Sequence, residues 1–316
     1  MRAALTFTIF LFISTCSSNV DPVKQTETAI SGTQVALENT RTALSLGATQ
    51  TALAQEGEAL QVVVAGTQTH EALFDRGIRD NSDWIPDIEI FDGVQMAYVP
   101  AGCFMMGSSD AEIDYAVSLG AERERLDNET PQHQVCLDAF WIDVYEVTNA
   151  QFAQFNGQAA NASYSTEANR PREQITWFEA SDFCAARDAQ LPSESQWEYA
   201  ARGPEGLIFP WGNTFVAENV VSGDNQTADV GSRPGGISWV GAYDLSGNVW
   251  ELTRTVYAAD GYYSNMNDNS NRVLRGGSWG NLGVGLRAAD RGGSNPGVRF
   301  DDNGFRCVRS TNSSDN

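Results

Sequence analysis

The sequence predicts an α+β fold with little regular structure, and three observations support this class. Two short helices are marked by the capping residues Thr148 and Thr176, and Phe152 and Phe155 of the first lie at helical spacing. Strand-like apolar segments surround Cys103 and Cys136. The stretch from Gly203 to Gly304 holds 19 of the 29 glycines, which favours turns and short strands over long helices.

The composition excludes several classes of function. The chain of 316 residues has 41 acidic and 20 basic side chains and a formal net charge of −21. This balance argues against nucleic acid as a partner, because phosphate binding depends on cationic side chains. The only lysine is Lys24, so the folded part has none for a Schiff base or a phosphate-binding loop. With only His70 and His133, a multi-histidine metal centre is excluded as well.

Residues 1–16 are predicted to be a bacterial lipoprotein signal peptide. Arg2 precedes an apolar run, 3–13, that is too short to span a bilayer and is typical of a signal peptide. The small residues that end at Cys16 resemble a lipobox, which would make Cys16 the lipidated first residue of the mature chain. Several acyl chains on Cys16 would anchor the protein firmly to a membrane. The alternative is ordinary secretion, with Cys16 removed or left spare.

Residues 17–80 are rich in Thr, Ala and Gln and are predicted to be a stalk. A loose Thr-Ala-Leu theme recurs, and leucines such as Leu37 and Leu44 lie seven residues apart, as in a weak coiled coil that would oligomerise the protein. Glycines interrupt this pattern, and Thr is a poor helix former. We therefore favour a semi-flexible stalk that lifts the following domain off the membrane.

Residues 81–310 form the predicted folded domain, the head, and 311–316 form a disordered tail. The head contains all eight tryptophans and four of the five cysteines, which are Cys103, Cys136, Cys184 and Cys307. In an exported domain these four predict two disulfides, with three possible pairings. Cys103 and Cys136 could join neighbouring strands, which would leave Cys184 for Cys307. A metal site is less favoured because no Cys-x-x-Cys pair is present.

The two capped helices are expected at 148–155 and 177–187. In the first, Phe152 and Phe155 fall on one face, because residues three apart are neighbours on a helix surface. In the second, Phe178 and Phe183 are expected to be available to the core.

A third helix is expected to open within Ser193–Glu198, because a helix N-terminus favours negative charge. Trp197 is expected to pack in the core, and Arg202 could pair with a carboxylate. Glu194 and Glu198 are four residues apart on one face, a spacing that could serve an acid/base pair. A solvated or salt-bridged helix face is the alternative that we favour.

A series of motifs carries a family resemblance. It runs from Met106–Ser108, Glu129–His133 and Tyr145–Asn149 through Leu191–Gly203 and Pro210–Asn213 to Gly247–Glu251, Arg275–Trp279 and Gly304–Arg306. In this order the motifs resemble the formylglycine-generating enzyme, or sulfatase-modifying factor, family over essentially the whole head. The resemblance implies a C-type-lectin-like, loop-dominated fold with bound calcium, and it supports the pairing of Cys184 with Cys307.

Calcium is the cofactor that the sequence supports best. Calcium takes six to eight oxygens from carboxylates, amides and main-chain carbonyls on irregular loops. The resemblance implies one site from the side chains of Asp244 and Glu251 and the carbonyls of Gly247 and Val249. A second site would use the remaining implied residues, which are Asn219, the Val220 carbonyl and Asp224. Plain surface charge is the alternative for each acidic residue.

The sequence departs from the active oxidases of this family at the copper site. In those enzymes two cysteines follow the Arg-Gly-Gly-Ser motif and bind copper as thiolates, the ligands that soft copper(I) needs. Asn281 and Leu286 occupy the matching positions, and no cysteine lies between Cys184 and Cys307. Copper is therefore not expected, and neither is oxidation of a sulfatase cysteine.

Residues 279–303 are the candidate ligand-binding surface. Small, polar and apolar residues alternate there without helix or strand periodicity, which is typical of a functional loop. The segment is similar to the C-terminal region of lectin-like proteins that retroelements diversify. Because Trp, Phe and Arg anchor many interfaces, the candidate contacts are Trp279, Asn281, Arg287, Arg291, Arg299 and Phe300. The alternative is an ordinary family loop whose arginines are structural.

These patterns together predict an extracytoplasmic protein, lipid-anchored at the bacterial cell envelope through Cys16. Its head is expected to bind a protein or glycan ligand and to be stabilised by calcium, and the stalk could form an oligomer. The enzyme alternative is a formylglycine-generating-type oxidoreductase or another protein-modifying activity of the family. A binder predicts ligand contacts at 279–303, whereas an enzyme predicts turnover that is lost when a few of these residues change.

Overall fold

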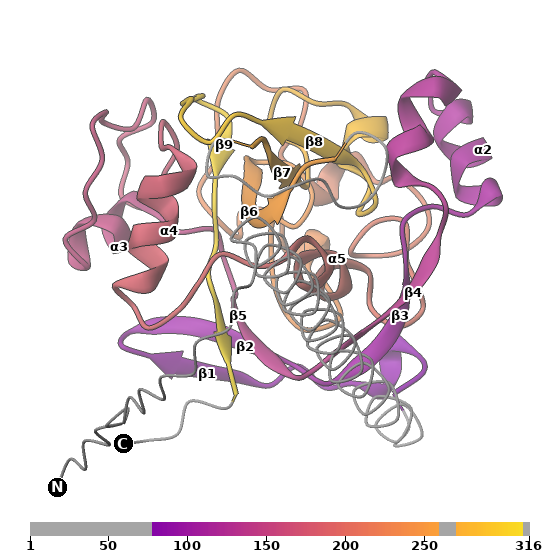
Figure 1. Ribbon diagram of the computed structural model, residues 1–316, viewed down its shortest axis with the longest axis horizontal. Coiled ribbons are helices and arrows are strands. Elements are labelled where there is room, and N and C mark those ends of the chain that lie inside the picture. The colour runs from indigo at the N-terminus through magenta and orange to yellow at the C-terminus, as the bar shows by residue number, and fades with distance from the viewer. Residues whose placement is uncertain (1–77, 259–269, 312–316) are drawn as a thin grey trace, which may run out of the picture. The chain divides into compact units, whose positions relative to one another are not determined.

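The computed structural model describes residues 78–258 and 270–311. The predicted signal peptide, Cys16, nearly all of the stalk and most of the tail lie outside the described residues. Within those residues, no helix is long and apolar enough to cross a membrane. The head combines short strands, short helices and long irregular connections (Figure 1), so the predicted α+β, loop-rich class is confirmed.

A four-stranded antiparallel sheet joins the two ends of the head. Its strands, in spatial order, are β1 (Ile88–Phe91), β2 (Val94–Val99), β5 (Phe140–Asp143) and β10 (Val308–Ser310). Ala97, Ile142 and Val308 are paired in register across it, and each is fully buried. The first and last strands of the head are therefore held on one hydrophobic core, which fixes the start and the end of the domain together.

A two-stranded ribbon carries the first disulfide. Strand β3 (Gly102–Met106) pairs with β4 (His133–Leu137), and Cys103 lies directly opposite Cys136, to which it is bonded. The predicted link between neighbouring strands is confirmed. One strand-like segment was expected around Cys103, but the structure has two strands there, β2 and β3, separated at Pro100–Ala101. Proline has no N–H to donate to a strand ladder, which explains the break.

A second four-stranded sheet frames the candidate ligand-binding segment. Its order is β8 (Arg291–Ser294), β7 (Arg272–Arg275), β6 (Trp250–Val256) and β9 (Asn303–Gly304). Strand β9 runs parallel to β6, whereas the other pairs are antiparallel. Because β7, β8 and β9 all belong to this sheet, the chain between them is anchored at 275, at 291–294 and at 303.

Four α-helices are described, and each begins with a reciprocal capping box. They are α2 (Asp110–Ser118), α3 (Asn149–Gln154), α4 (Trp177–Ala185) and α5 (Glu194–Arg202), capped by Ser109, Thr148, Thr176 and Ser193. The capping roles predicted for Thr148 and Thr176 are confirmed. Each cap satisfies N–H groups that the first turn would leave unpaired, typically worth about 1 kcal/mol. Helix α2 was not predicted.

Short 3₁₀ helices fill several of the connections. They are η1 (Asn81–Asp83), η2 (Arg123–Glu129), η3 (Ala217–Asn219), η4 (Pro234–Gly236) and η5 (Gly283–Leu286). This abundance of single turns between 203 and 304 agrees with the glycine-rich sequence there.

The aromatic predictions are confirmed with one exception. Phe152 and Phe155 both pack on Phe183, with ring centroids 5.1 and 6.1 Å away, and Trp197 is fully buried. Phe178 is 39% exposed, so its expected place in the core is wrong. It follows Trp177 at the start of α4, and Phe183 lies on the buried side of the helix instead.

Helix α5 lies at the centre of the head, in contact with β3, β6 and β7 (Figure 1). The second disulfide joins Cys184 of α4 to Cys307 beside β10, across 123 residues of sequence, as the family resemblance implied. Helix α4 is thereby tied to the last strand. Helix α5, which contacts β6 and β7, presents its polar side chains to the sheet that carries the candidate ligand-binding segment.

Candidate ligand-binding surface, ion-pair network and calcium loop

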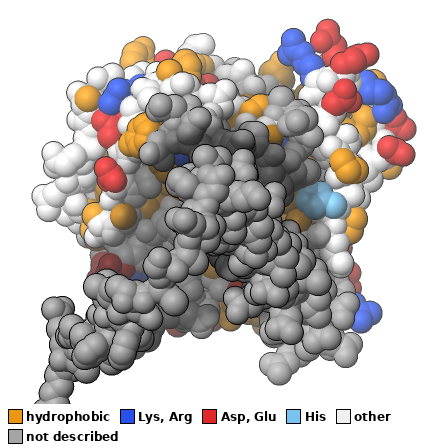
Figure 2. Space-filling model, in the orientation of Figure 1, with side chains coloured by type: hydrophobic (Ala, Val, Ile, Leu, Met, Phe, Trp, Pro, Cys, Tyr) orange, Lys and Arg blue, Asp and Glu red, His pale blue; other side chains and the backbone are white. Residues whose placement is uncertain are grey.

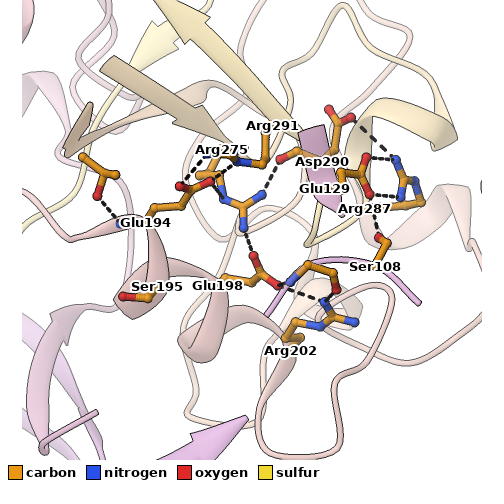
Figure 3. A network of polar contacts seen from close by, with 12 residues as sticks. Ser108, Glu129, Glu194, Ser195, Glu198, Arg202, Arg275, Arg287, Asp290 and Arg291 are labelled. Carbon is orange, nitrogen blue, oxygen red and sulfur yellow. Dashed lines mark hydrogen bonds and ion pairs between the residues drawn. The ribbon is translucent and has the colours of Figure 1, made fainter. Parts of the chain in front are cut away.

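A buried network of ion pairs lies beneath the candidate surface (Figure 3). Glu198 of α5 is its centre: one carboxylate oxygen accepts bonds from Gly107 N at 2.8 Å and Arg202 Nη1 at 2.9 Å. The other accepts a bond from Arg275, at the end of β7. Burial alone would raise the pKa of Glu198, but Arg275 and Arg202 outweigh it and lower the pKa. Glu198 is thus a buried anion held by two cations.

Glu194 extends the network along the same helix. Its carboxylate pairs with Arg291 of β8, with Nη2 and Oε2 3.0 Å apart. Both side chains are 3% exposed, and Glu194 N also donates a hydrogen bond to the Thr255 hydroxyl at 3.0 Å. The predicted alternative of a salt-bridged helix face therefore describes Glu194 and Glu198, which are engaged by arginines rather than open to a substrate.

Arg287 forms a second buried pair. Its guanidinium makes two parallel bonds to Glu129, of 2.8 and 2.6 Å, and Ser108 Oγ donates to the same carboxylate at 2.6 Å (Figure 3). Asp290 lies beside them, and its burial, together with the charge of Glu129, raises its pKa to about 6. A bidentate arginine–carboxylate pair fixes orientation as well as distance.

Two predicted ligand contacts are therefore corrected. Arg287 and Arg291 are both buried, and each is paired with a buried glutamate. They match the alternative in which the arginines of the segment are structural. Glu129, the partner of Arg287, lies in one of the recognised motifs, but no local signal in the sequence connects residues 158 positions apart.

The turn after β7 contains the positions that match the family's copper cysteines. Asn281 Oδ1 accepts bonds from Ser278 N at 2.9 Å and from Ser278 Oγ at 3.0 Å, so its amide closes a turn. Leu286 is fully buried, in one cluster with Phe209 and Val220. Asn281 is thus a turn residue with a half-buried side chain, and Leu286 is part of the core.

Several other residues of the segment face solvent. Leu282, Val298 and Phe300 are 73%, 39% and 49% exposed, and Trp279 is half-buried. Arg299 is 25% exposed and pairs with Glu179 of α4 at 2.7 Å. Of the six predicted contacts, Phe300 is exposed, and Trp279, Asn281 and Arg299 are partly exposed. Trp279 and Asn281 belong to the turn, whereas Arg299 and Phe300 lie between β8 and β9.

The predicted calcium loop, 244–251, is sharply bent. Asp244, Gly247 and Asn248 all have positive φ, of 58°, 80° and 59°. Asp244 Oδ2 accepts a bond from Gly231 N at 2.6 Å. Glu251 is fully buried and accepts bonds from Arg306, at 2.7 and 2.8 Å, and from Trp197 Nε1 at 2.9 Å. Left-handed residues turn successive carbonyls in different directions, as an irregular cation loop requires.

A third buried carboxylate, Glu146, belongs to this loop and was missed by the sequence reasoning. Its Oε1 accepts a bond from Val249 N at 3.2 Å and its Oε2 one from Asn248 Nδ2 at 2.6 Å. Burial, followed by the charges of Asp244 and Glu251, raises its pKa well above the usual range. Its position in the motif Tyr145–Asn149 was the available signal, although the motif does not say what the carboxylate contacts.

The loop has carboxylates and main-chain carbonyls of the kinds that a divalent cation takes as ligands. Three buried carboxylates, Glu146, Asp244 and Glu251, interact with one another and share one guanidinium, Arg306. Burial, with a smaller contribution from the charge of Glu251, raises the pKa of Asp244 to about 6. Glu251 accepts three hydrogen bonds, and a carboxylate has about four lone-pair sites. Across 78–258 and 270–311, no three His, Cys, Asp or Glu side chains form a cluster that could hold a metal, so main-chain carbonyls would have to contribute.

The second predicted site fits less well. A Cβ on Gly235 would lie 2.1 Å from Asn219 Oδ1, and one on Gly236 would lie 2.2 Å from the Asn219 carbonyl, so both oxygens face that turn. Asp224 is exposed, and its N–H bonds to the Trp279 carbonyl at 2.9 Å. Val220 is buried in the cluster of Leu286. These contacts direct Asp224 toward the ligand-binding segment and do not support it as the acidic partner of Asn219.

Comparison with known proteins places the head in a family. Residues 89–311 match the model of the sulfatase-modifying factor enzyme 1-like domain. The chain is 30% identical over 249 residues to the serine/threonine-protein kinase Pkn1 of Chlamydia trachomatis, covering 68% of this chain and 38% of that protein. It is 27% identical over 286 residues to the mouse inactive C-alpha-formylglycine-generating enzyme 2, covering 68% and 85%. The chain thus spans well under half of Pkn1.

Two solved structures share the fold. PvdO from Pseudomonas aeruginosa has a TM-score of 0.59 at 23% identity, and the Treponema denticola variable protein 1 has a TM-score of 0.54 at 22% identity. In each case the match covers 72% of this chain and 99% of the other. At these identities the likeness shows the fold.

Proposed function

The chain belongs to the family of sulfatase-modifying factor enzyme 1-like domains, and on this premise we propose that it is a ligand-binding module that does not oxidise its partner. The head would present a loop surface, 295–303 with Trp279 and Leu282, on a frame stabilised by calcium. The ligand is a protein or a glycan. Similarity to a relative named inactive and to a variable protein of the same fold supports this proposal.

One observation carries the proposal: Asn281 and Leu286, at the positions that match the copper cysteines, both have structural roles. The Asn281 amide closes the turn at Ser278, and Leu286 fills a buried apolar cluster. Neither side chain supplies the soft sulfur ligand that copper(I) needs. Replacing Asn281 and Leu286 by cysteine would disturb a turn and a buried apolar cluster. Both side chains therefore have structural roles at the positions that match the copper ligands.

A kinase activity is not proposed, although one relative carries that name. The chain spans 38% of that relative, and its only lysine, Lys24, lies outside the matched domain. The positioning of nucleotide phosphates in kinases relies on a lysine within the fold.

The accessible residues suit recognition of a partner. Phe300, Leu282 and half-buried Trp279 offer apolar and aromatic area, while Arg299 is held by Glu179. Aromatic and arginine side chains supply much of the binding energy at interfaces. Because the frame beneath them is fixed by ion pairs and by β7, β8 and β9, the ordering cost of binding would be small.

Calcium would be held at the loop 244–251. We propose the side chains of Asp244 and Glu251 and the carbonyls of Gly247 and Val249 as ligands. The ion would supply positive charge beside carboxylates that share one arginine. Glu146 orients the loop by accepting bonds from Val249 N and Asn248 Nδ2.

An oxidase assay tests the main proposal. The purified full chain, in detergent, is incubated with copper, calcium, oxygen, a reductant and a Cys-x-Pro-x-Arg peptide, and the peptide is read by mass spectrometry. We expect no aldehyde, beside an active formylglycine-generating enzyme as the positive control. Conversion of the cysteine by the chain itself would overturn the proposal and show that other residues replace the thiolates.

Calorimetry of the calcium-stripped full chain tests the cofactor. We expect calcium to bind the wild type and to bind Asp244→Asn at least about tenfold more weakly, since a charged oxygen ligand is lost. Asp224→Asn, which removes one charge from an exposed residue, is the matched control and should stay within about twofold. No uptake by the wild type, or equal losses in both variants, would contradict the calcium site.

Location at the cell envelope is also proposed. Two disulfides in a chain this size are typical of an oxidising compartment. Membrane attachment through Cys16 predicts that the wild type sediments with membranes and that Cys16→Ala is released. Release of neither form, or of both, would remove Cys16 as the anchor, and cross-linking of the full chain would report whether the stalk forms an oligomer.

A further inference from the structure

Two adjoining hollows lie at the start of α2, lined by residues from 105–132 and 204–213. The first, of about 490 Å³, lies between α2 and η2, and the second, of about 400 Å³, lies between α2 and the chain after α5. Ser109 and Gln132 line both, so the two form one extended site. Each volume falls within the range of about 300–1,000 Å³ typical of ligand sites. In Figure 1 this region lies on the right, where α2 stands above β3 and β4.

The wall that separates the hollows is built and rigid. The Glu112 carboxylate accepts bonds from Ser109 N at 2.7 Å, from Gln132 Nε2 at 3.1 Å and from buried Arg202. Ser109 in turn caps α2. The N-terminus of α2 is therefore already satisfied by a carboxylate, which leaves it unattractive to an anion.

Apolar surface is available in both hollows. Pro131, which is exposed, lines the first hollow together with Ile113 and Leu126, which are almost fully buried. Met105, which is 42% exposed, and half-buried Ile208 line the second. Aliphatic chains of a ligand can therefore lose contact with water on either side of the shared wall.

The charge around the hollows is negative. Asp110 and Asp127 are exposed at the first, and Glu205 is exposed at the second. Arg123, a cation that lines the first hollow, is paired with Asp114, and Arg202 is buried between Glu112 and Glu198. Figure 2 shows acidic and basic side chains mixed over the part of the surface that carries α2. The net charge of −21 adds long-range attraction for a cationic partner.

From this arrangement we propose that the adjoining hollows bind an extended peptide segment with basic side chains. Its Arg or Lys heads reach Asp127 in one hollow and Glu205 in the other, and their aliphatic stems lie on Pro131 and Met105. The described residues that line the hollows include no aromatic ring on which a sugar could stack, which favours a peptide over a glycan. This site is independent of the surface proposed at 279–303.

The probe is a blocked Ala-Arg-Ala-Arg-Ala peptide, titrated into the full chain by calorimetry at low and high salt. Binding that weakens with salt is expected, because the rim charges are exposed. The same peptide with Glu in place of Arg should not bind. No binding of the basic peptide, equal binding of both peptides, or binding of neutral oligosaccharides in its place would overturn the proposal.

Charge variants locate the site. Asp127→Asn combined with Glu205→Gln should weaken the basic peptide about three- to tenfold, as expected for two exposed ion pairs. Glu89→Gln combined with Glu218→Gln removes the same charge from exposed residues that line neither hollow and should stay within about twofold. Equal weakening in both would show diffuse attraction to an acidic protein and would sink the site.

A blocking variant separates the hollow from its rim. Ala111→Trp places a large ring in the second hollow from the exposed start of α2 and should abolish peptide binding. Val117→Trp adds the same ring to α2 at a position that is 37% exposed, and it should bind like the wild type. Undiminished binding by Ala111→Trp would rule out the second hollow. Both variants leave the 279–303 surface intact and should give the same oxidase result as the wild type. Failure of the peptide site at α2 can therefore be distinguished from failure of the proposed function.

Discussion

Residues 286–294 and 295–300 follow one another in the chain, yet they differ in what their arginines contact. In the first stretch, Arg287 and Arg291 are buried and paired with glutamates that are at most 3% exposed. In the second, Arg299 is 25% exposed, its partner Glu179 is 18% exposed, and Phe300 beside it is open to solvent. The first stretch is frame, and the second is surface.

In this molecule the role of an arginine depends on how deeply its partner is buried. A buried glutamate without its arginine is an unpaired charge in a medium of low dielectric constant, which is costly. An exposed glutamate without its arginine is simply hydrated.

Arg287→Ala should lower the free energy of unfolding by about 3–5 kcal/mol, because it leaves Glu129 buried and unpaired. Chemical denaturation of the full chain measures this. The double variant Arg287→Met with Glu129→Met should recover most of the loss, since it removes both charges and retains much of the volume. A loss below about 1 kcal/mol in the single variant would mean that the pair is not structural.

Replacing Cys184 and Cys307 by Ala should cost about 2–4 kcal/mol, because the bridge closes a long loop and holds α4 against β10. Cys103 and Cys136 join adjacent paired strands over a separation of 33, so their removal should cost less. Thermal unfolding of both variants, under identical redox conditions, gives the comparison. A larger loss on removing Cys103–Cys136 than on removing Cys184–Cys307 would contradict this expectation.

Glu179→Gln probes the surface stretch through pH. Burial alone would raise the pKa of Glu179, but bonds from Arg299 and from the main chain of Thr176 and Ala160 lower it to about 2. A lowered folded pKa gives stability that is present above the ordinary value of 4.5 and is lost as pH falls toward 2. The variant should be less stable by about 1–2 kcal/mol at pH 7 and should equal the wild type near pH 2. A difference that does not change with pH would contradict this role.

Phe300→Ala should change stability by less than about 0.5 kcal/mol, because the ring is about half exposed before the substitution. Its effect is expected on ligand binding instead. The matched variant Phe305→Ala removes a fully buried ring and should cost about 3–5 kcal/mol. Similar losses for the two rings would erase the distinction between surface and frame.

Sequence patterns predicted the local features of the fold well. Thr148 and Thr176 are capping residues because a hydroxyl followed three residues later by Gln or Glu satisfies the first turn. The Cys103–Cys136 link was predicted because adjacent strands bring two cysteines together, and the family resemblance supplied Cys184–Cys307. These features depend on near neighbours or on a motif series that spans the head.

Contacts between distant residues could not be predicted in the same way. Arg287 and Glu129 are 158 positions apart, and a sequence pattern does not reveal which carboxylate will be buried opposite which arginine. Glu146 was missed because its role depends on the loop that folds against it. Phe178 lies on the outer side of α4, where periodicity alone allowed either direction.

Amide hydrogen exchange of the full chain with calcium, read by mass spectrometry, tests the division between frame and surface most directly. Fragments within 286–294 and 303–308 should exchange only through rare opening, and those within 295–300 should exchange far faster, because local opening there exposes little buried area. Removing calcium should speed exchange at 244–251 first. Equal protection across 286–300 would contradict the division between frame and surface, since the candidate ligand-binding segment would then be one continuous structural unit.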